Sequence, residues 1–77
     1  MTLKIISAAK VEFTGEVTLV KLPGALGEFT VLENHASLVA ALRAGTVEYE
    51  QDGTRHTLSI AGGIADVDHN VVSVSIN

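Results

Sequence analysis

Short apolar–polar alternations, interrupted by turn residues, run through nearly all of the 77-residue chain. Alternation with a period of two places every second side chain on the same face, which is typical of a half-buried β-strand. Turn signals recur close to the roughly 8–12-residue rhythm of β-sandwiches and barrels; they are Gly15, Pro23, Asn34, Gly45, Gly53, Gly62 and Asn70. No internal repeat or linker is visible, so the sequence predicts one all-β domain over residues 1–77.

The clearest alternation lies in segments 10–14, 16–22, 28–32, 46–50, 57–60 and 72–76. From the first three we expect these inward-facing residues: Val11, Phe13, Val17, Leu19, Phe29 and Val31. We expect Gly15 to end the first strand and Pro23-Gly24 to form a turn in which glycine takes a positive φ. Asp52-Gly53 is a strong hairpin signal between segments 46–50 and 57–60.

Residues 36–44 (ASLVAALRA) are less clear, because alanine and leucine prefer helix. The segment is short and lies among strands, so we interpret it as a strand that is buried on both faces. Its outer face would then need a cover, which suggests a surface for a partner.

Composition excludes several classes of protein. Five Lys plus Arg against nine Asp plus Glu give a net charge of −4, the wrong sign for binding a nucleic-acid backbone. Apolar residues make up 47% of the chain, too many for intrinsic disorder, and the absence of cysteine excludes disulfides and thiolate chemistry. The longest aliphatic run, Leu38–Leu42, is far shorter than the roughly 20 residues of a membrane span, and the N-terminus lacks the apolar stretch of a signal peptide.

The search for catalytic or metal-binding groups yields little. Asp66 and Asp68 share one face of a strand beside His69, but alternation around Val67 already explains them as a solvent face, and metals need three or four converging ligands. His56 follows a hairpin tip and is expected to be solvated. His35 lies in a polar turn, where a surface contact or a structural hydrogen bond fits better than catalysis. We therefore expect no metal and no cofactor.

Two glycine motifs are candidates for ligand-binding loops. Gly24–Gly27 has the GxxG spacing of a nucleic-acid clamp, but it lies between strands and is followed by an acid. Gly62-Gly63 lacks the lysine of a phosphate loop, so a bulge or a close approach of two backbones is favoured. The loop Pro23–Gly27 carries an apolar Leu26 at its tip, which is typical of a docking point.

Taken in order, several motifs resemble the N-terminal domain of the epsilon subunit of the F-type, proton-transporting ATP synthase. They are Ser7 to Gly15 with Phe13, Leu22–Phe29 (LPGALGEF), Val31-Leu32, Asn34-His35-Ala36, Ala41-Leu42, Gly45 and Gly62–Val67 (GGIADV). The resemblance covers essentially the whole chain. The departures are Glu33 and Ser37, where the family often has proline, and Ala61, where it often has serine; the missing prolines concern the stiffness of the His35 turn.

The resemblance implies a flattened β-sandwich or barrel of about ten short strands. It implies a non-catalytic rotor subunit of the central stalk, which joins the gamma subunit to the c-ring and couples proton-driven rotation to ATP synthesis. It further implies a peripheral position on the cytoplasmic face of a bacterial inner membrane, with no membrane insertion. Many family members continue into a C-terminal helical hairpin, and these 77 residues contain no pattern for one.

Two sets of contact residues follow from the resemblance. Leu26, Gly27 and Glu28 match the loop that faces the c-ring. Five other residues match the surface that faces gamma, and they are Ser7, His35, Val39, Ala40 and Ile64.

A different class also remains open at this stage, namely a small all-β carrier of biotin or lipoate, or another protein-binding module. In such carriers the modified lysine sits at an exposed hairpin tip. The lysines of this chain, Lys4, Lys10 and Lys21, all lie away from the Asp52-Gly53 tip, which argues against a carrier.

Overall fold

The computed structural model describes all 77 residues, which form nine β-strands and no helix. The strands are β1 (Thr2–Ile6), β2 (Val11–Glu16), β3 (Leu19–Gly24), β4 (Gly27–Leu32), β5 (Leu38–Leu42), β6 (Gly45–Gln51), β7 (Thr54–Ile60), β8 (Gly63–Asp68) and β9 (Val71–Ile76). This architecture confirms the all-β expectation. The chain has no helix that could span a membrane.

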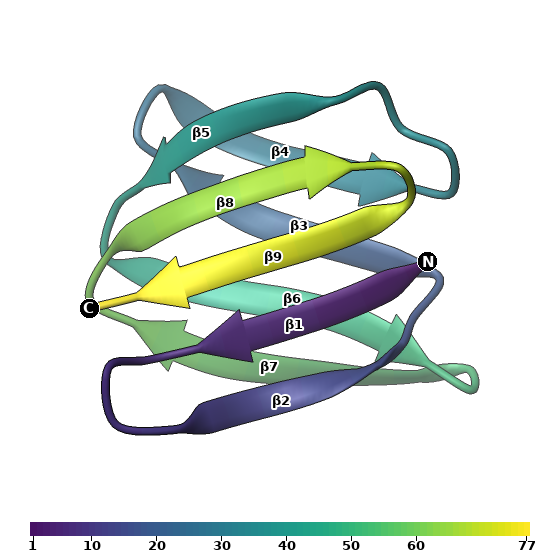
Figure 1. Cartoon of the computed structure of the whole chain (residues 1–77), viewed down its shortest axis with the longest axis horizontal. Helices are drawn as coiled ribbons and strands as arrows, with labels where there is room; N and C mark the ends of the chain where they lie inside the picture. Colours follow the sequence, from purple (N-terminus) through teal and green to yellow (C-terminus); the bar gives the residue numbers. More distant parts are fainter.

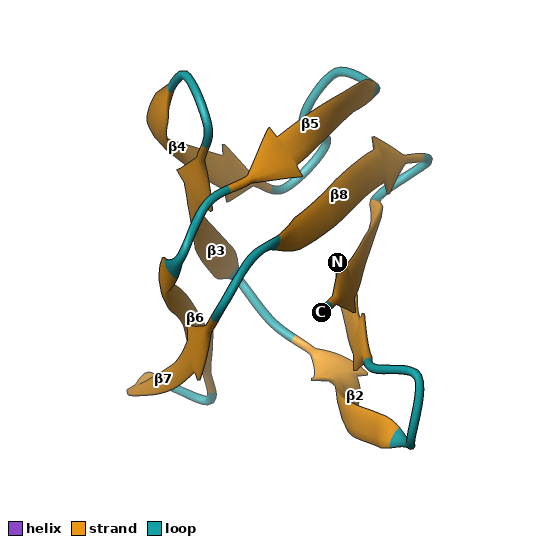
Figure 2. Cartoon of the chain, turned by 90° about the vertical axis from the view of Figure 1, so that its left-hand side faces the viewer, coloured by secondary structure: helices purple, strands orange, loops and turns teal.

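All nine strands belong to one sheet that curls into two layers. The strand order is β2-β1-β9-β8-β5-β3-β6-β7, and β4 pairs with β3 beside this path. Strands β5, β8, β9, β1 and β2 make the front layer in Figure 1, and β4, β3, β6 and β7 lie behind them. Figure 2 shows the two layers edge-on, with several connections, including the one from β2 to β3, crossing from one layer to the other. All pairs are antiparallel except β1 with β9.

The core fills the space between the layers with aliphatic side chains. Fourteen buried apolar residues form one cluster: Met1, Leu3, Ile5, Val17, Val20, Leu22, Val31, Leu42, Val47, Ile60, Ala65, Val67, Val72 and Val74. Most of them come from alternate positions of their strands, so the period-two pattern selects the core directly. No polar or charged side chain is buried.

The first alternating segment, residues 10–14, differs from the expectation at Val11. The pairing of β1 with β2 shifts between Ile5 and Ile6, so Ile5 lies opposite Phe13 while Ile6 lies opposite Val11. The extra residue is Glu12, and this bulge turns Val11 away from the core, leaving it 60% exposed. Gly15 does not end the strand, because it pairs with Leu3.

The chain crosses from the front layer to the back layer between β2 and β3. The inward-facing positions of β3 therefore do not continue the every-second-residue pattern of β2. The amide of Val17 donates to the carbonyl of Met1 in the front layer, and the amide of Thr18 donates to Glu50 in the back layer. Val17 is buried as predicted, but Val20 and Leu22, rather than Leu19, are the fully buried residues of β3.

The predicted turn at Pro23-Gly24 is wrong. Both residues are buried within β3, and Gly24 has no positive φ. The turn falls two residues later, at Ala25-Leu26, and Gly27 takes the positive φ of 138°. By contrast, the Asp52-Gly53 hairpin is confirmed, with positive φ at both residues (51° and 77°), as the twist of a two-residue hairpin requires.

Segment 36–44 is a strand, as expected, but only one of its faces is buried. Leu42 is buried and Leu38 and Ala40 are half-buried, whereas Val39 and Ala41 are exposed. The reason is that β5 lies in the front layer, so one of its faces meets the core and nothing in this chain covers the other.

Gly62-Gly63 marks a close approach of two backbones, as the sequence indicated. A Cβ added to Gly63 would lie 2.2 Å from the carbonyl oxygen of Ser75 in the neighbouring strand β9. Any side chain here would force β8 and β9 apart.

Candidate partner-binding surface

The glycine-rich turn between β3 and β4 lies against strand β5. The amide of Ala25 donates to the carbonyl of Ala41 at 2.8 Å, and the amide of Arg43 donates to the carbonyl of Pro23 at 2.9 Å. Between turn and strand lies a hollow of about 240 Å³. Its lining is mostly apolar and consists of Gly24, Ala25, Leu26, Gly27, Phe29, Val39, Ala40 and Ala41.

Glycine at position 24 allows this turn to close. A Cβ at Gly24 would lie 2.5 Å from the carbonyl oxygen of Gly27 and 3.0 Å from the Phe29 ring. The tight closure pushes the turn outward, and Leu26 at its tip is fully exposed (106%). A leucine with no partner in its own chain is available to one in another chain.

Glu28 is already engaged inside the chain. Its carboxylate lies 3.5 Å from the Lys21 ammonium on the neighbouring strand β3. Both side chains are substantially exposed, so the pair contributes little to stability and can exchange for a cation on another protein.

The structure brings parts of the two predicted contact sets into one hollow. Leu26 and Gly27, from the set assigned to the c-ring, line it together with Val39 and Ala40, from the set assigned to gamma. Ile64 is one strand away, in register with Ala41, and is 55% exposed. Val39 and Ile64 lie on the outer face of the sheet, whereas Ala40, opposite the buried Ala65, lines the hollow from the core-facing side of β5.

His35 and Ser7 lie apart from this surface. His35 sits in the connection between β4 and β5, half-buried, with Nδ1 2.7 Å from the carbonyl oxygen of Ala36. Ser7 follows the end of β1, and its hydroxyl bonds Lys10 and Glu12 within the β1–β2 connection. Both residues therefore have local structural bonds.

A second, shallower hollow of about 380 Å³ adjoins Val39 at the other end of β5. Asp66 and Asp68 line it and point outward, with Val67 in the core, as alternation predicted. Ser37 donates to Asp68 at 2.7 Å and His69 Nδ1 lies 3.0 Å from it. The bond from Ser37, and secondarily that from His69, lowers the pKa of the Asp68 carboxyl.

The remaining ionisable candidates are dispersed. No group of three or more His, Asp and Glu side chains converges in a way that could hold a metal ion. His56 is exposed and stacks on Tyr49 with ring centroids 5.3 Å apart. Lys4 and Lys21 lie within strands, and Lys10 ends the β1–β2 connection.

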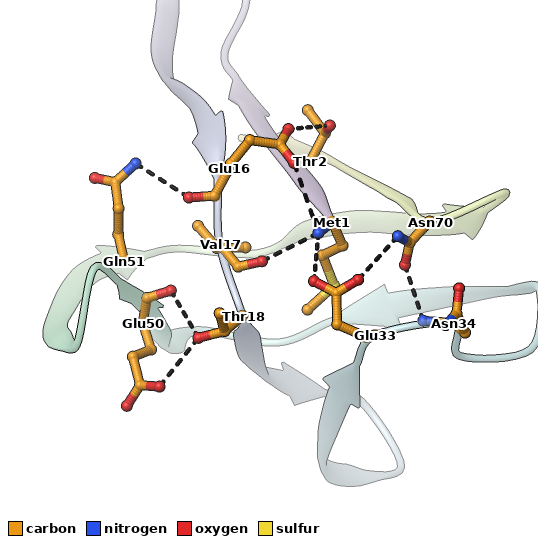
Figure 3. Close-up of polar contacts among 10 residues, drawn as sticks. All are labelled: Met1, Thr2, Glu16, Val17, Thr18, Glu33, Asn34, Glu50, Gln51 and Asn70. Carbon is orange, nitrogen blue, oxygen red and sulfur yellow. Dashed lines mark hydrogen bonds and ion pairs between the residues drawn. The ribbon is translucent and has the colours of Figure 1, made fainter.

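A polar cluster ties the chain start to two turns, as Figure 3 shows. The N-terminal ammonium donates to the Glu33 carboxylate at 2.5 Å and to the Val17 carbonyl at 3.2 Å. Asn70 donates to the same carboxylate and accepts from the Asn34 amide, both at 2.9 Å. The ammonium contact first, and then the Asn70 bond, lower the pKa of Glu33. This cluster has a structural role, because each of its groups is used within the chain.

Several neighbouring residues support this surface without any sequence motif that announces them. Ala25 and Ala41 hold the hollow together through backbone bonds, and Lys21 neutralises Glu28. The exposure of Ile6 and Val11 likewise depends on a bulge that no local motif announces.

Comparison with known proteins identifies the family. The family model described as "ATP synthase, Delta/Epsilon chain, beta-sandwich domain" matches residues 1–77. The chain belongs to this family. The resemblance inferred from the ordered motifs is thereby confirmed, and the carrier alternative is set aside.

The curated relatives are ATP synthase epsilon chains of bacteria. The one from Campylobacter lari is 41% identical over 75 residues, which are 96% of this chain and 58% of that protein. The one from Nitrobacter winogradskyi is 39% identical over 70 residues, which are 91% of this chain and 52% of that protein. The chain thus spans a little over half the length of these epsilon chains.

Solved structures carry the same fold. A chain in the structure of the Euglena gracilis mitochondrial ATP synthase, OSCP/F1/c-ring, matches 96% of this chain and 48% of its own length, with a TM-score of 0.89 and 27% identity. A chain in the Tetrahymena thermophila mitochondrial ATP synthase, central stalk/c-ring, matches with a TM-score of 0.84 but 10% identity, so it shows the fold alone.

Proposed function

We propose that this chain is the non-catalytic rotor domain of an epsilon subunit. In this role it joins the central-stalk gamma subunit to the c-ring, so that proton-driven rotation reaches the sites of ATP synthesis. The observation that carries the proposal is the apolar hollow with Leu26 at its rim, because it offers a binding surface and no reactive groups. Family membership and the Euglena assembly, which contains F1 and a c-ring, support it. The domain would act peripherally, at the cytoplasmic face of a bacterial inner membrane.

We assign the β3–β4 turn to the c-ring. Leu26 projects from a turn held by backbone bonds to β5, so the turn can transmit force without bending at a long loop. Full burial of a leucine side chain contributes about 1.5–3 kcal/mol to binding. Glu28 would exchange Lys21 for a cation of the ring, a contact that sets orientation more than affinity.

We assign the adjoining surface on β5 and β8 to gamma. Val39 and Ile64 supply exposed apolar area, and Ala40 lines the adjoining hollow beside the turn from the core-facing side of β5. Ser7 and His35 are peripheral to it and would contact gamma only at the margin. Two contacts on adjoining surfaces of one rigid sandwich would make the domain a connector between stalk and ring.

The ring contact is tested with Glu28→Lys in the assembled ATP synthase. Replacing the carboxylate by an ammonium places a positive charge beside Lys21 and opposite a cationic ring loop. ATP-driven proton pumping should therefore fall severalfold. The isolated chain should keep its circular dichroism spectrum. Glu50→Lys makes the same charge change on β6, also beside a cation of a neighbouring strand (Arg55) but outside both contact sets, and serves as the control. Pumping that is unchanged in Glu28→Lys would refute this assignment.

The gamma contact is tested with Ala40→Asp, mixed with gamma and examined by native mass spectrometry. Because Ala40 lies opposite the buried Ala65, circular dichroism must first show that the variant is folded. A charge at the edge of the apolar hollow should remove the one-to-one complex, because the carboxylate would lose its water without gaining a partner. Ala61→Asp, at an exposed position of the β7–β8 connection outside both contact sets, is the matched control. Retention of the complex by Ala40→Asp would place gamma elsewhere on the domain.

A further inference from the structure

The outer face of the front layer gathers most of the exposed large apolar side chains. Of the six such residues in the chain, four lie on this face: Ile6 (43% exposed), Val11 (60%), Val39 (72%) and Ile64 (55%). They come from four different strands, so the apolar area extends across the layer that faces the viewer in Figure 1. Nothing in the chain covers it.

The strand register gives this face an internal symmetry about β9. Ser73 of β9 lies beside Lys4 of β1 on one side and beside Asp66 of β8 on the other. We call residues in register across β1, β9 and β8 a row. In the next outward-facing row, Ser75 lies between Ile6 and Ile64. Opposite charges and matching isoleucines thus flank a central strand of small serines.

Lys4 and Asp66 do not pair within one chain. They are two strand spacings apart, about 10 Å, and Lys4 has no ion pair in this structure. Each is an exposed charge on the central strands of this face, and the exposed Asp68 lies in the row next to Asp66.

A second copy of the same face complements this arrangement. Turning a copy by 180° about an axis that lies in the interface along β9 exchanges the positions of β1 and β8 and keeps each row in place. Lys4 then faces Asp66 of the second copy, Ile6 faces its Ile64, and each central serine faces itself. Asp68 faces the hydroxyl of Thr2 in the same way.

We propose that the free chain forms a symmetric dimer through this face, with β9 at its centre. Two twisted sheets pack with their strands within about 30° of each other, so contacts are best near the central strand. The two longer dimensions of the molecule, 26 and 23 Å, give the face an area of roughly 600 Å² per copy, the low end of specific interfaces. The dimer is therefore weak and forms at high protein concentration.

The dimer goes beyond the proposed rotor function and stands independently of it. Val39 and Ile64 lie on the same face, so a chain bound to gamma through them could not dimerise in this way. Because the following test uses this chain alone, its failure leaves the rotor proposal untouched, and failure of the rotor experiments leaves the dimer untouched.

The test is sedimentation equilibrium at low salt, from about 10 µM to 1 mM protein. Lys4→Asp alone and Asp66→Lys alone should each weaken the dimer at least tenfold. In the dimer of either variant, both contacts between position 4 of one copy and position 66 of the other join like charges. An equimolar mixture of the two variants should recover the wild-type dimer to within about threefold, because both pairs in the mixed dimer join opposite charges. Both positions are exposed, and circular dichroism checks that the variants fold.

Lys10→Asp is the matched control, since it changes the net charge as Lys4→Asp does but lies outside the central rows. Alone it should dimerise like wild type, and its mixture with Asp66→Lys should contain no strong mixed dimer. A wild-type chain that stays monomeric at 1 mM would overturn the proposal. So would a mixture of Lys4→Asp and Asp66→Lys that dimerises no more tightly than each of these two variants alone.

Discussion

At the scale of residues, two positions where the family often has proline carry side chains that fasten turns. Glu33 accepts from Asn70, which also accepts from the Asn34 amide, and Ser37 donates to Asp68. These bonds join the β4–β5 connection to the end of β8 and to the β8–β9 turn. Proline stiffens a chain by removing backbone freedom, whereas here polar side chains hold the same connection from outside.

Replacing Ser37 by alanine should change how stability responds to acid. The Ser37 bond is the main reason that the pKa of Asp68 lies below its ordinary value of 3.8. Stabilisation from such a lowered pKa is complete above the unfolded value and is lost as the pH falls through the folded value. In Ser37→Ala the Asp68 pKa should rise toward 3.8, and stability should fall less steeply in this acid range.

An NMR titration of the Asp68 carboxyl carbon measures the shift directly. Ser59→Ala, in β7, is the control, because the Ser59 hydroxyl makes no hydrogen bond in the structure. An Asp68 pKa that is the same in Ser37→Ala and in wild type would show that the hydroxyl is not its cause.

Gly63 and Gly27 allow the cost of backbone strain to be separated from the cost of a steric clash with a new Cβ atom. Both have φ values that side chains rarely adopt (158° and 138°), but a Cβ at Gly27 meets nothing, while one at Gly63 meets the Ser75 carbonyl. Gly27→Ala should therefore cost about 1–3 kcal/mol for backbone strain. Gly63→Ala should cost clearly more in the free energy of unfolding by urea, and equal losses in the two variants would contradict the close approach.

At the scale of elements, hairpin chemistry explains why one turn was predictable and another was not. Asp52-Gly53 has positive φ at both positions, the geometry that the Asp-Gly pair favours. Pro23-Gly24 is equally suggestive as a dipeptide, yet β3 continues through it because Pro23 pairs with Glu28 and Gly24 with Gly27. Pairing to β4 outweighs the local turn preference.

Strand β5 should respond to substitution on one face only. Leu42→Ala removes a buried side chain from the core cluster and should cost about 2–4 kcal/mol, whereas Val39→Ala, on the open face, should change stability by no more than about 0.5 kcal/mol. Urea unfolding of both variants at low protein concentration measures the contrast. A loss above about 2 kcal/mol in Val39→Ala would mean that the outer face is buried after all.

At the scale of the whole molecule, the two layers are joined unevenly. The pairing between β3 and β5 consists of the single register position Gly24 with Leu42, supplemented by the backbone bonds at Ala25 and Arg43. Strand β9, in contrast, is paired along its length with both β1 and β8. Stability should therefore be concentrated around β9 and lower at the edge strands β2, β4 and β7, each of which pairs on one side only.

Hydrogen exchange followed by NMR measures this distribution. The amides of Val72 and Val74 should exchange at least about tenfold more slowly than the hydrogen-bonded amides of β7, because edge strands open locally without unfolding the core. Equal protection in β7 and β9 would indicate that the molecule opens only as one unit.

The sequence by itself determined the strand pattern, most of the core, the Asp52-Gly53 hairpin and the family, because alternation and turn chemistry are local properties of the chain. It identified Leu26 as a candidate contact, but the position of the turn and the engagement of Glu28 by Lys21 depend on strand pairing. Only the tertiary structure decided that β5 is open on one face, that a bulge turns Val11 outward, and that Lys4 and Asp66 flank β9. The physical reason is that register joins residues distant in sequence, and a shift by one residue exchanges the two faces of a strand.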